Sequence, residues 1–357
     1  MQAVTIEKWT WITPLAAWLV LIASMIVPGA VVFSLAGLAL IGTVVAAVHH
    51  AEVVAHRIGE PFGTLVLAVA VTVIEVALIV SVMLYGGADK EAIARDTVFA
   101  AIMICCNGIV GLCLLIGGIR HHEQGFQVQG ASSALAVLCA LSLLTMVLPN
   151  YATTVPGPGL ANSQLVFAGF ISLLLYLVFV FVQTISHRDY FLADGTGENE
   201  YAQPASNRVA LASLAWLILS LVAVVGLAKA LSPVVEGAVA RFGAPAAVVG
   251  IIIAALVLMP EGLAALRNAR ANRLQNSLNL ALGSALASIG LTIPTVAAVS
   301  LLTGRPIILG LVTKEIVLLA LTLIVGVITL GTGRTTLLQG VIHLVIFATF
   351  LFFAVVP

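Results

Sequence analysis

The chain has 357 residues, of which 61% are hydrophobic and only 8% are charged, and its formal net charge is zero. Soluble domains carry roughly 25% charged residues, so this composition excludes an ordinary soluble protein and indicates a polytopic membrane protein. A balanced charge also argues against nucleic acid as a partner. The four cysteines lie inside apolar runs, and we interpret them as packing residues.

Apolar runs long enough to cross a bilayer recur along the whole sequence. A hydrocarbon core of about 30 Å needs about 20 residues per helix, and backbone hydrogen bonds must close within each segment. The pattern therefore predicts an all-α membrane protein with about 11 transmembrane helices. Their expected ranges are 10–28, 30–48, 61–86, 94–119, 131–149, 162–184, 208–231, 245–268, 277–302, 307–331 and 336–357.

The longest polar connection, residues 185–207, divides the chain. Its acids are Asp189, Asp194, Glu198 and Glu200, and we interpret it as a solvated cytosolic linker. A calcium sensor is the alternative, although four acids over this length are sparse for one. The predicted organisation is an N-terminal transmembrane helix at 1–29, a five-helix repeat at 30–184, this linker, and a second five-helix repeat at 208–357.

The distribution of basic residues predicts an orientation. With 11 spans, nine of the 15 Lys and Arg residues fall on the side of the N-terminus and six on the other side. Basic residues favour the cytoplasmic side. We therefore expect a cytoplasmic N-terminus and an external C-terminus, in a bacterial inner membrane.

The two halves share a motif. Glu52 is followed by Arg57, Gly59 and Pro61, and Glu236 is followed in the same register by Arg241, Gly243 and Pro245. Each motif precedes a helix that carries a second glutamate, Glu75 in the first half and Glu261 in the second. We expect Glu52 to open the third span and Glu236 the eighth. Because five helices separate the motifs, the two repeats would be inverted, a plan common in secondary transporters.

Glu75 and Glu261 are the strongest candidates for a functional site. A carboxylate within an apolar span is costly to bury and is a functional hypothesis by default. We expect Pro260 to interrupt the helix at Glu261 and to free a backbone carbonyl. The alternative is a structural glutamate bonded to a serine or to the backbone. Two carboxylates that share one dry pocket could hold protons or release them to a hard cation.

Polar neighbours could complete such a site. Thr72, Asn107, Ser284 and Ser288 could supply further oxygen ligands. The two serines could equally form a close-packing helix surface, since small residues four apart often do so. Asn107 is the stronger candidate because an amide in hydrocarbon requires a partner.

Two further titratable residues fall within spans. Glu315 and His343 could form a proton path, pair with each other, or lie near an interface. By contrast, the run containing His49, His50, Glu52 and His56 has no zinc-type spacing, so we expect solvated residues at a helix end.

These stretches resemble the cation/calcium exchanger superfamily, in particular its bacterial ChaA-type calcium (sodium, potassium)/proton antiporters. The resemblance is carried by HRIGEPFGTLVLAVAVTVIEVALI, by ARDTVFAAIMICCNGIVGLCLLIGGIR and by LVLMPEGLAALRNARANRLQNSLNLALGSALASIGLTIP. It implies ten core helices in two inverted sets, with Glu75 and Glu261 as ligands of the transported cation and as proton carriers. Many relatives have Gly-Asn ahead of each glutamate, whereas Val71-Thr72 and Val257-Leu258 stand here, which leaves room for monovalent cations.

The expected function is therefore cation/proton antiport by alternating access, most simply Ca²⁺/H⁺ exchange, without a cofactor. Na⁺/H⁺ or K⁺/H⁺ exchange on the same fold is the nearest alternative. An intramembrane enzyme or a channel is a more distant one, and no helix pairs a nucleophile with a base as an enzyme would require.

Overall fold

The computed structural model describes residues 7–59, 62–85, 91–155, 157–192, 206–241, 243, 245 and 247–356. The linker acids Asp194, Glu198 and Glu200, together with Pro61 and the side chain of Glu236, lie outside them. The chain divides into two compact units. Unit 1 comprises residues 1–87 and 197–246, and unit 2 comprises residues 88–196 and 247–357.

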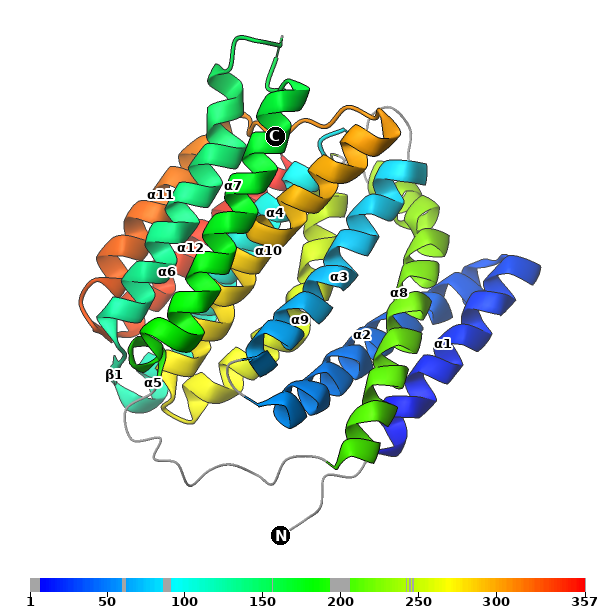
Figure 1. The fold of residues 1–357 in the computed structure, drawn as a ribbon, viewed down its shortest axis with the longest axis horizontal. Helices are drawn as coiled ribbons and strands as arrows, with labels where there is room; N and C mark the ends of the chain where they lie inside the picture. The colour runs from blue at the N-terminus through cyan, green and yellow to red at the C-terminus, as the bar shows by residue number, and fades with distance from the viewer. Residues whose placement is uncertain are drawn as a thin grey trace. The chain divides into compact units, whose positions relative to one another are not determined.

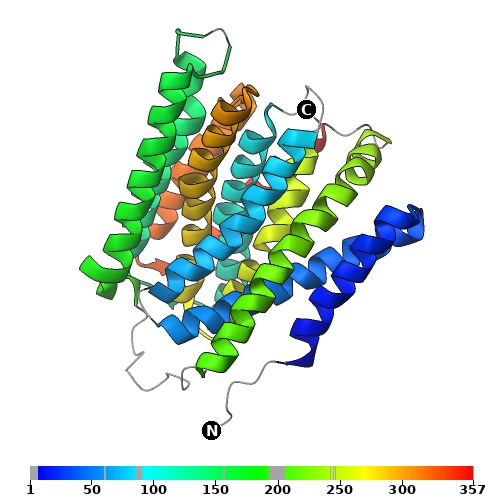
Figure 2. The same cartoon turned by 45° about the vertical axis from the view of Figure 1, so that its right-hand side comes forward.

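Unit 1 is a set of four helices in which α2 packs against each of the others. They are α1 (Lys8–Ile26), α2 (Ala30–Ile58), α3 (Phe62–Tyr85) and α8 (Asn207–Arg241). α8 also contacts α1 and α3. Figures 1 and 2 show α8 crossing α2, with which it is in contact.

Unit 2 holds the remaining helices and one very short sheet. Its first half contains α4 (Ile93–Met103), the π-helix η2 (Ile104–Ile109), α5 (Val110–His121), α6 (Val128–Ser142) and α7 (Asn162–Phe181). Its second half contains α9 (Ala247–Arg270), α10 (Leu274–Thr303), α11 (Thr313–Leu330) and α12 (Leu337–Val355). Strands β1 (Gln124–Gly125) and β2 (Arg334–Thr335) pair antiparallel and join the α5–α6 connection to the α11–α12 connection.

The prediction of an all-α membrane protein is confirmed. Within the described residues, ten helices are long and apolar enough to cross a membrane, and α3 adds a shorter apolar stretch, Val69–Met83. The largest differences from the expected ranges are at α2, which continues to Ile58, at α8, which continues to Arg241, and at α11, which begins only at Thr313. The segment 304–312 ahead of α11 is apolar but not helical.

The expected interruption at Pro260 is wrong. α9 runs through Pro260 as one helix, because losing a single backbone donor need not break a helix whose neighbours pack around it. Pro260 still has no N–H to offer the Leu256 carbonyl. Irregular helical backbone lies elsewhere among the described residues: at η2, six residues widen into a π-helix between α4 and α5, and shorter π-helices occur at η3 (Leu143–Val147) and η5 (Val182–Ser186).

The repeated motif marks a helix end and not a helix start. Glu52 lies within α2 and Glu236 within α8, so neither opens the following span. Gly59 and Gly243 come after these helices with φ of +77° and +67°. Glycine adopts positive φ without the steric penalty of other residues, so each half places a glycine where the backbone has positive φ after the helix that carries the acid of the motif.

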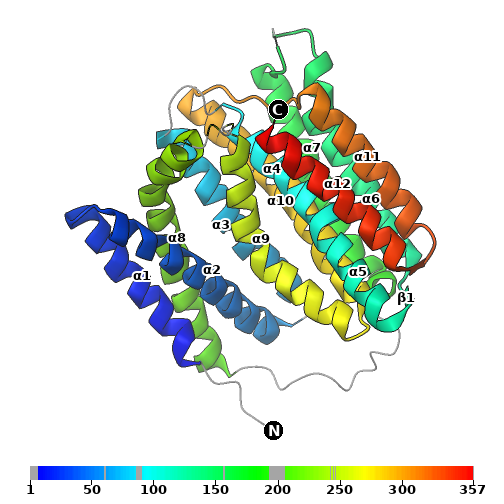
Figure 3. The ribbon, with the colours of Figure 1, turned by 180° about the vertical axis from the view of Figure 1, so that it is seen from behind.

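Packing in unit 2 is reciprocal between the halves. α5 packs against α12, and α10 packs against α7. Counting spans from α2 in the first half and from α8 in the second, α5 belongs to the third span and α7 is the fifth, while α10 is the third and α12 the fifth. The third span of each half therefore contacts the fifth span of the other half. Figure 3 shows α12 lying between α5 and α11, both of which it contacts. This exchange of partners is what a twofold structural repeat requires.

His50 is not solvated, contrary to expectation. Its side chain is fully buried, and its Nε2 lies 3.0 Å from the Thr10 carbonyl of α1. In a regular helix that carbonyl would accept the N–H of residue 14, which here is Pro14 and has none. His50 supplies the missing donor and so joins α2 to α1.

Candidate functional site

Glu261 lies on the face of α9 that packs inside unit 2. The side chain is 6% exposed, and α9 contacts α4, η2, α5 and α10. The next residue, Gly262, approaches η2 so closely that a methyl group there would lie 3.3 Å from Ile109. Glu261 is therefore placed in the turn of α9 that contacts the π-helix.

The same face of α9 meets the serines of α10. Ser277 Oγ donates to the Ala265 carbonyl at 2.7 Å, one turn beyond Glu261. Because α9 and α10 are joined by a short turn and run back along each other, Glu261 is level with about Ala281, and Ser284 lies roughly 4.5 Å beyond that level at about 1.5 Å per residue. Ser288 lies one further turn along and is buried, whereas Ser284 is half-buried.

Asn107 lies in η2 and is fully buried. Its Nδ2 donates to Thr322 Oγ1 of α11 at 2.9 Å, and its Oδ1 lies 3.1 Å from His343 Nδ1 of α12. Both polar atoms of the amide are thus bonded to helices of the other half. π-helical turns are frequent at functional sites, and this one aims a polar side chain into an otherwise apolar interior.

The bonds continue beyond Asn107. His343 Nε2 lies 3.2 Å from Thr329 Oγ1, and Thr322 Oγ1 donates to the Leu318 carbonyl at 2.7 Å. We call Asn107, Thr322, Thr329 and His343 the interior cluster. Each of its side chains is at most 3% exposed. The cluster contains no acidic or basic side chain other than the imidazole.

Glycines bring α12 close enough to α5 for this contact. A methyl group on Gly111 would lie 3.1 Å from the Cβ of His343. One on Gly340 would lie 2.4 Å from the backbone nitrogen of Leu115. Small residues at helix interfaces let two backbones approach closely, so the position of His343 depends on these glycines.

Glu75 and Thr72 lie on α3 in unit 1. They are 3% and 6% exposed and lie on the same face of the helix, since residues three apart are neighbours there. Within its unit α3 contacts α2 and α8. Glu75 thus belongs to one unit and Glu261 to the other, and their pairing in a shared pocket stays a prediction.

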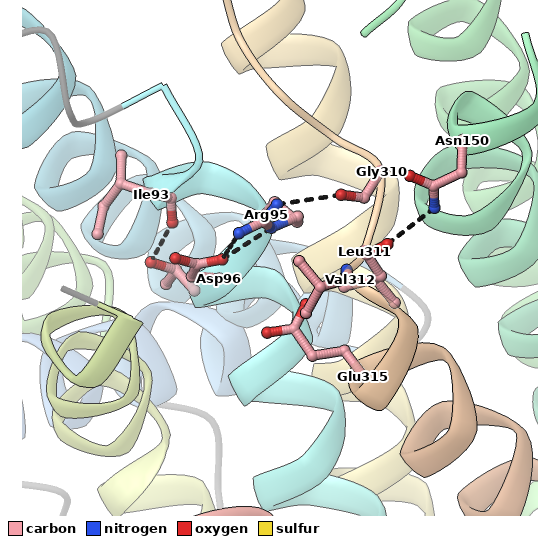
Figure 4. Close-up of polar contacts among 9 residues, drawn as sticks. Ile93, Arg95, Asp96, Asn150, Gly310, Leu311, Val312 and Glu315 are labelled. Atoms are coloured by element: carbon pink, nitrogen blue, oxygen red, sulfur yellow. Dashed lines mark hydrogen bonds and ion pairs between the residues drawn. The ribbon is translucent and has the colours of Figure 1, made fainter. Parts of the chain in front are cut away.

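A second polar group, the end cluster, lies at the start of α4. It consists of Arg95, Asp96, Asn150, Glu315 and the segment 304–312. Arg95 forms an ion pair with Asp96, with Nη2 2.7 Å from Oδ1, and donates to the Gly310 carbonyl at 3.1 Å. Asn150 donates to the Leu311 carbonyl at 2.8 Å. Figure 4 shows these side chains gathered around the segment that leads into α11.

Glu315 and His343 are not brought together. Glu315 lies in the first turn of α11, where its carboxylate accepts the Val312 N–H at 3.1 Å. His343 bonds Thr329, 14 residues further along the same helix, which is roughly 21 Å at 1.5 Å per residue. The alternative in which these two residues pair with each other is therefore wrong, and a proton path through either one stays a prediction.

Several of these hydrogen-bond partners were not predicted from the sequence. Thr322 and Thr329 are seven residues apart on α11, a spacing that places both on one face, and this could have marked them as partners for a buried amide. Nothing in the composition marks η2 as π-helical. The Arg95–Asp96 pair was not predicted, and residues 307–312, which include its partner Gly310, were expected to be helical.

Residues 9–185 and 212–356 match the family described as sodium/calcium exchanger protein. The protein y4hA of Sinorhizobium fredii is 51% identical over 362 residues, covering 100% of this chain and 98% of that one. The sodium-potassium/proton antiporter ChaA of Escherichia coli K12 is 35% identical over 328 residues, covering 90% of this chain and 88% of its own.

Solved structures share the fold. The native structure of YfkE superposes with a TM-score of 0.75 at 18% identity, covering 98% of this chain and 100% of that one. The H⁺/Ca²⁺ exchanger CAX superposes with a TM-score of 0.70 at 13% identity, covering 97% of this chain and 89% of its own. At such identities these likenesses concern the fold alone.

Proposed function

The chain belongs to the sodium/calcium exchanger protein family, and on that premise we propose that it is a secondary cation/proton antiporter whose ligands are Glu75 and Glu261. The observation that carries this proposal is the burial of both carboxylates, at 3% and 6% exposure, at matched positions of two similar halves. Membership in an exchanger family makes the chain a transporter and not an enzyme.

The exchange follows from the chemistry of buried carboxylates. An ionised carboxylate in a dry site must be neutralised by a proton or by a metal cation, because burial disfavours the bare charge. Protons and cations therefore compete for the same two groups. If only a loaded site can reorient, this competition is sufficient for antiport. We expect the hydroxyl oxygens of Thr72, Ser284 and Ser288 to contribute further ligands.

Calcium is the cation that we propose first, since paired carboxylates and surrounding oxygens suit a hard divalent ion. A specific observation favours the alternative, Na⁺/H⁺ or K⁺/H⁺ exchange. The 35% identical relative is a sodium-potassium/proton antiporter, and the residues ahead of the two glutamates, Thr72 and Leu258, supply no amide oxygen.

We also propose two inverted five-helix repeats behind α1, with the N-terminus in the cytoplasm of a bacterium and the C-terminus outside. The reciprocal packing of α5 on α12 and of α10 on α7 supports the repeat. The excess of basic residues on the side of the N-terminus supports the orientation. A cysteine introduced at Val356 should then react with an impermeant thiol reagent applied from outside intact cells.

The test is cation-driven proton movement in everted vesicles that contain a pH-sensitive dye. Glu75→Gln and Glu261→Gln should each abolish exchange, because an amide cannot alternate between a proton and a cation. Glu123→Gln is the matched control, since this carboxylate is exposed and faces Arg334 on the surface. Running Ca²⁺, Na⁺ and K⁺ separately identifies the cation.

Two outcomes would overturn the proposal. Exchange retained by either glutamine variant would remove that glutamate from the site. Cation flux through the wild-type protein without proton movement would indicate a channel.

A further inference from the structure

We propose that His343 is a positioning residue of the antiporter: it bridges Asn107 and Thr329 as a fixed neutral ring and holds η2 against the Glu261 turn. This inference rests on the proposed function. It assigns His343 a role different from a proton path, and it concerns cation binding at Glu261.

The direction of each hydrogen bond can be derived from the acceptors. The Leu318 carbonyl can only accept, so the Thr322 hydroxyl donates its one hydrogen there. Thr322 Oγ1 must then accept from Asn107, which places the amide nitrogen of Asn107 at that contact. The amide oxygen therefore lies toward His343.

The acceptor on Asn107 also determines the tautomer of the His343 ring. The amide oxygen of Asn107 accepts only, so His343 Nδ1 carries the proton at the 3.1 Å contact. A neutral imidazole has one N–H, which leaves Nε2 as an acceptor for the Thr329 hydroxyl at 3.2 Å. Every polar atom of the ring is satisfied without any charge, in a side chain that is 1% exposed. A second proton on Nε2 would make that nitrogen a donor, so the Thr329 hydroxyl could no longer donate a hydrogen bond to it.

The bridge reaches the proposed cation site through the backbone. Asn107 and Ile109 belong to the same six-residue π-helix, and Ile109 packs on Gly262, beside Glu261. A π-helix is a strained insertion that persists only where its surroundings hold it. The hydrogen bonds from Thr322 of α11 and His343 of α12 to Asn107 stabilise the π-helix. Loss of these bonds lets η2 move, and with it the Ile109 side chain that packs beside Glu261.

Two conservative variants separate positioning from proton transfer. In His343→Asn the amide nitrogen takes the place of Nδ1, so the bond to Asn107 is kept. In His343→Gln the terminal amide takes the place of Nε2, so only the contact with Thr329 is kept. Neither variant titrates. His343→Leu removes both bonds.

Initial rates of exchange in proteoliposomes would be measured against cation concentration and against pH. We expect His343→Asn to keep the apparent KM within about twofold of wild type. His343→Gln and His343→Leu should raise it about fivefold, the equivalent of one interhelical hydrogen bond. The maximal rate and the shape of the pH profile should be unchanged in all three variants.

Equal losses in the Asn and Gln variants, or a displaced pH profile in both, would indicate a proton carrier and overturn the inference. An unchanged KM in His343→Leu would also overturn it. If His343→Leu fails to fold, the difference in apparent KM between His343→Asn and His343→Gln still distinguishes a positioning residue from a proton carrier. Glu261→Gln in the same assay tests the proposed function separately, because it abolishes exchange whatever the result at position 343.

Discussion

Unit 2 holds two polar groups that differ in the kind of bond they use. The interior cluster joins η2 to α11 and α12 through neutral groups that are at most 3% exposed. The end cluster joins α4 and the 3₁₀-helix η4 (Leu148–Tyr151) to the segment 304–312, and at its centre is the Arg95–Asp96 ion pair, with side chains 12% and 9% exposed. Both connect the first half of the chain to the second.

The difference follows from the cost of charge in hydrocarbon. A charged group in the middle of a membrane span is expensive, so the connection there is made with an amide, hydroxyls and a neutral ring. At a helix end, charge is tolerated, and there an ion pair can hold the non-helical segment 304–312 against α4. The buried glutamates are the exception to this rule, and this is the physical reason to assign them the transported ion.

The largest expected effect on stability is at the ion pair. Arg95→Ala leaves the Asp96 carboxylate buried without its counter-ion and should lower the free energy of unfolding by about 3 kcal/mol. Unfolding by SDS in mixed micelles measures this. Arg334→Ala removes a 3.7 Å pair whose side chains are 74% and 49% exposed, and should cost less than about 1 kcal/mol. If the double variant Arg95→Ala/Asp96→Ala were no more stable than Arg95→Ala, the uncompensated charge would not be the cause.

The second largest effect on stability is expected at the close contact between α12 and α5. Gly340→Ala places a methyl group 2.4 Å from a backbone atom of α5, so α12 must move away, at a cost of about 2 kcal/mol. The matched control is Gly283→Ala on α10, where a methyl group meets nothing within 4 Å. That variant should be neutral or slightly stabilising. Thermal melts in detergent would compare the two, and equal melting temperatures would contradict close packing at Gly340.

Removing a single neutral hydrogen bond from the interior cluster should lower the free energy of unfolding by a smaller amount. Thr322→Val removes the acceptor of Asn107 and should cost about 1 kcal/mol. Thr349→Val is its control on α12, since that hydroxyl is exposed and bonds only its own helix at Val345. The same SDS titration measures both. A loss in Thr349→Val as large as that in Thr322→Val would show that hydroxyl removal itself, and not the bond between helices, is responsible.

The smallest effect is expected at Glu315. Glutamine keeps the bond to the Val312 N–H and loses only the negative charge at a helix N-terminus, which is worth about 0.5 kcal/mol. Stability and exchange rate should therefore both stay near wild type in Glu315→Gln. A severe loss of exchange with normal stability would instead place Glu315 on the proton path.

Much of the molecule could be predicted from local pattern. Long apolar runs located the spans, because a helix is the only simple way to satisfy the backbone in a bilayer. Gly59 and Gly243 marked equivalent turns, since each precedes a proline and follows a motif shared by both halves. Glu75, Glu261 and Asn107 could be identified because a buried acid or amide among apolar neighbours is conspicuous in any sequence.

Other features depended on contacts between distant segments. Pro260 does not interrupt α9, because neighbouring helices hold a helix together where one donor is missing. His50 is buried because Pro14, 36 residues earlier, leaves the Thr10 carbonyl without a helical partner.

The sequence by itself determined which segments span the membrane and which side chains are too polar for their surroundings, since both follow from the transfer of residues into hydrocarbon. Only the tertiary structure decided that Asn107 meets Thr322 and His343, and that His343 of α12 bonds Thr329 near one end of α11 while Glu315 lies at the other end. Hydrogen bonds between helices depend on the rotation and depth of each helix, and these are set by packing across the whole unit and not by any single segment.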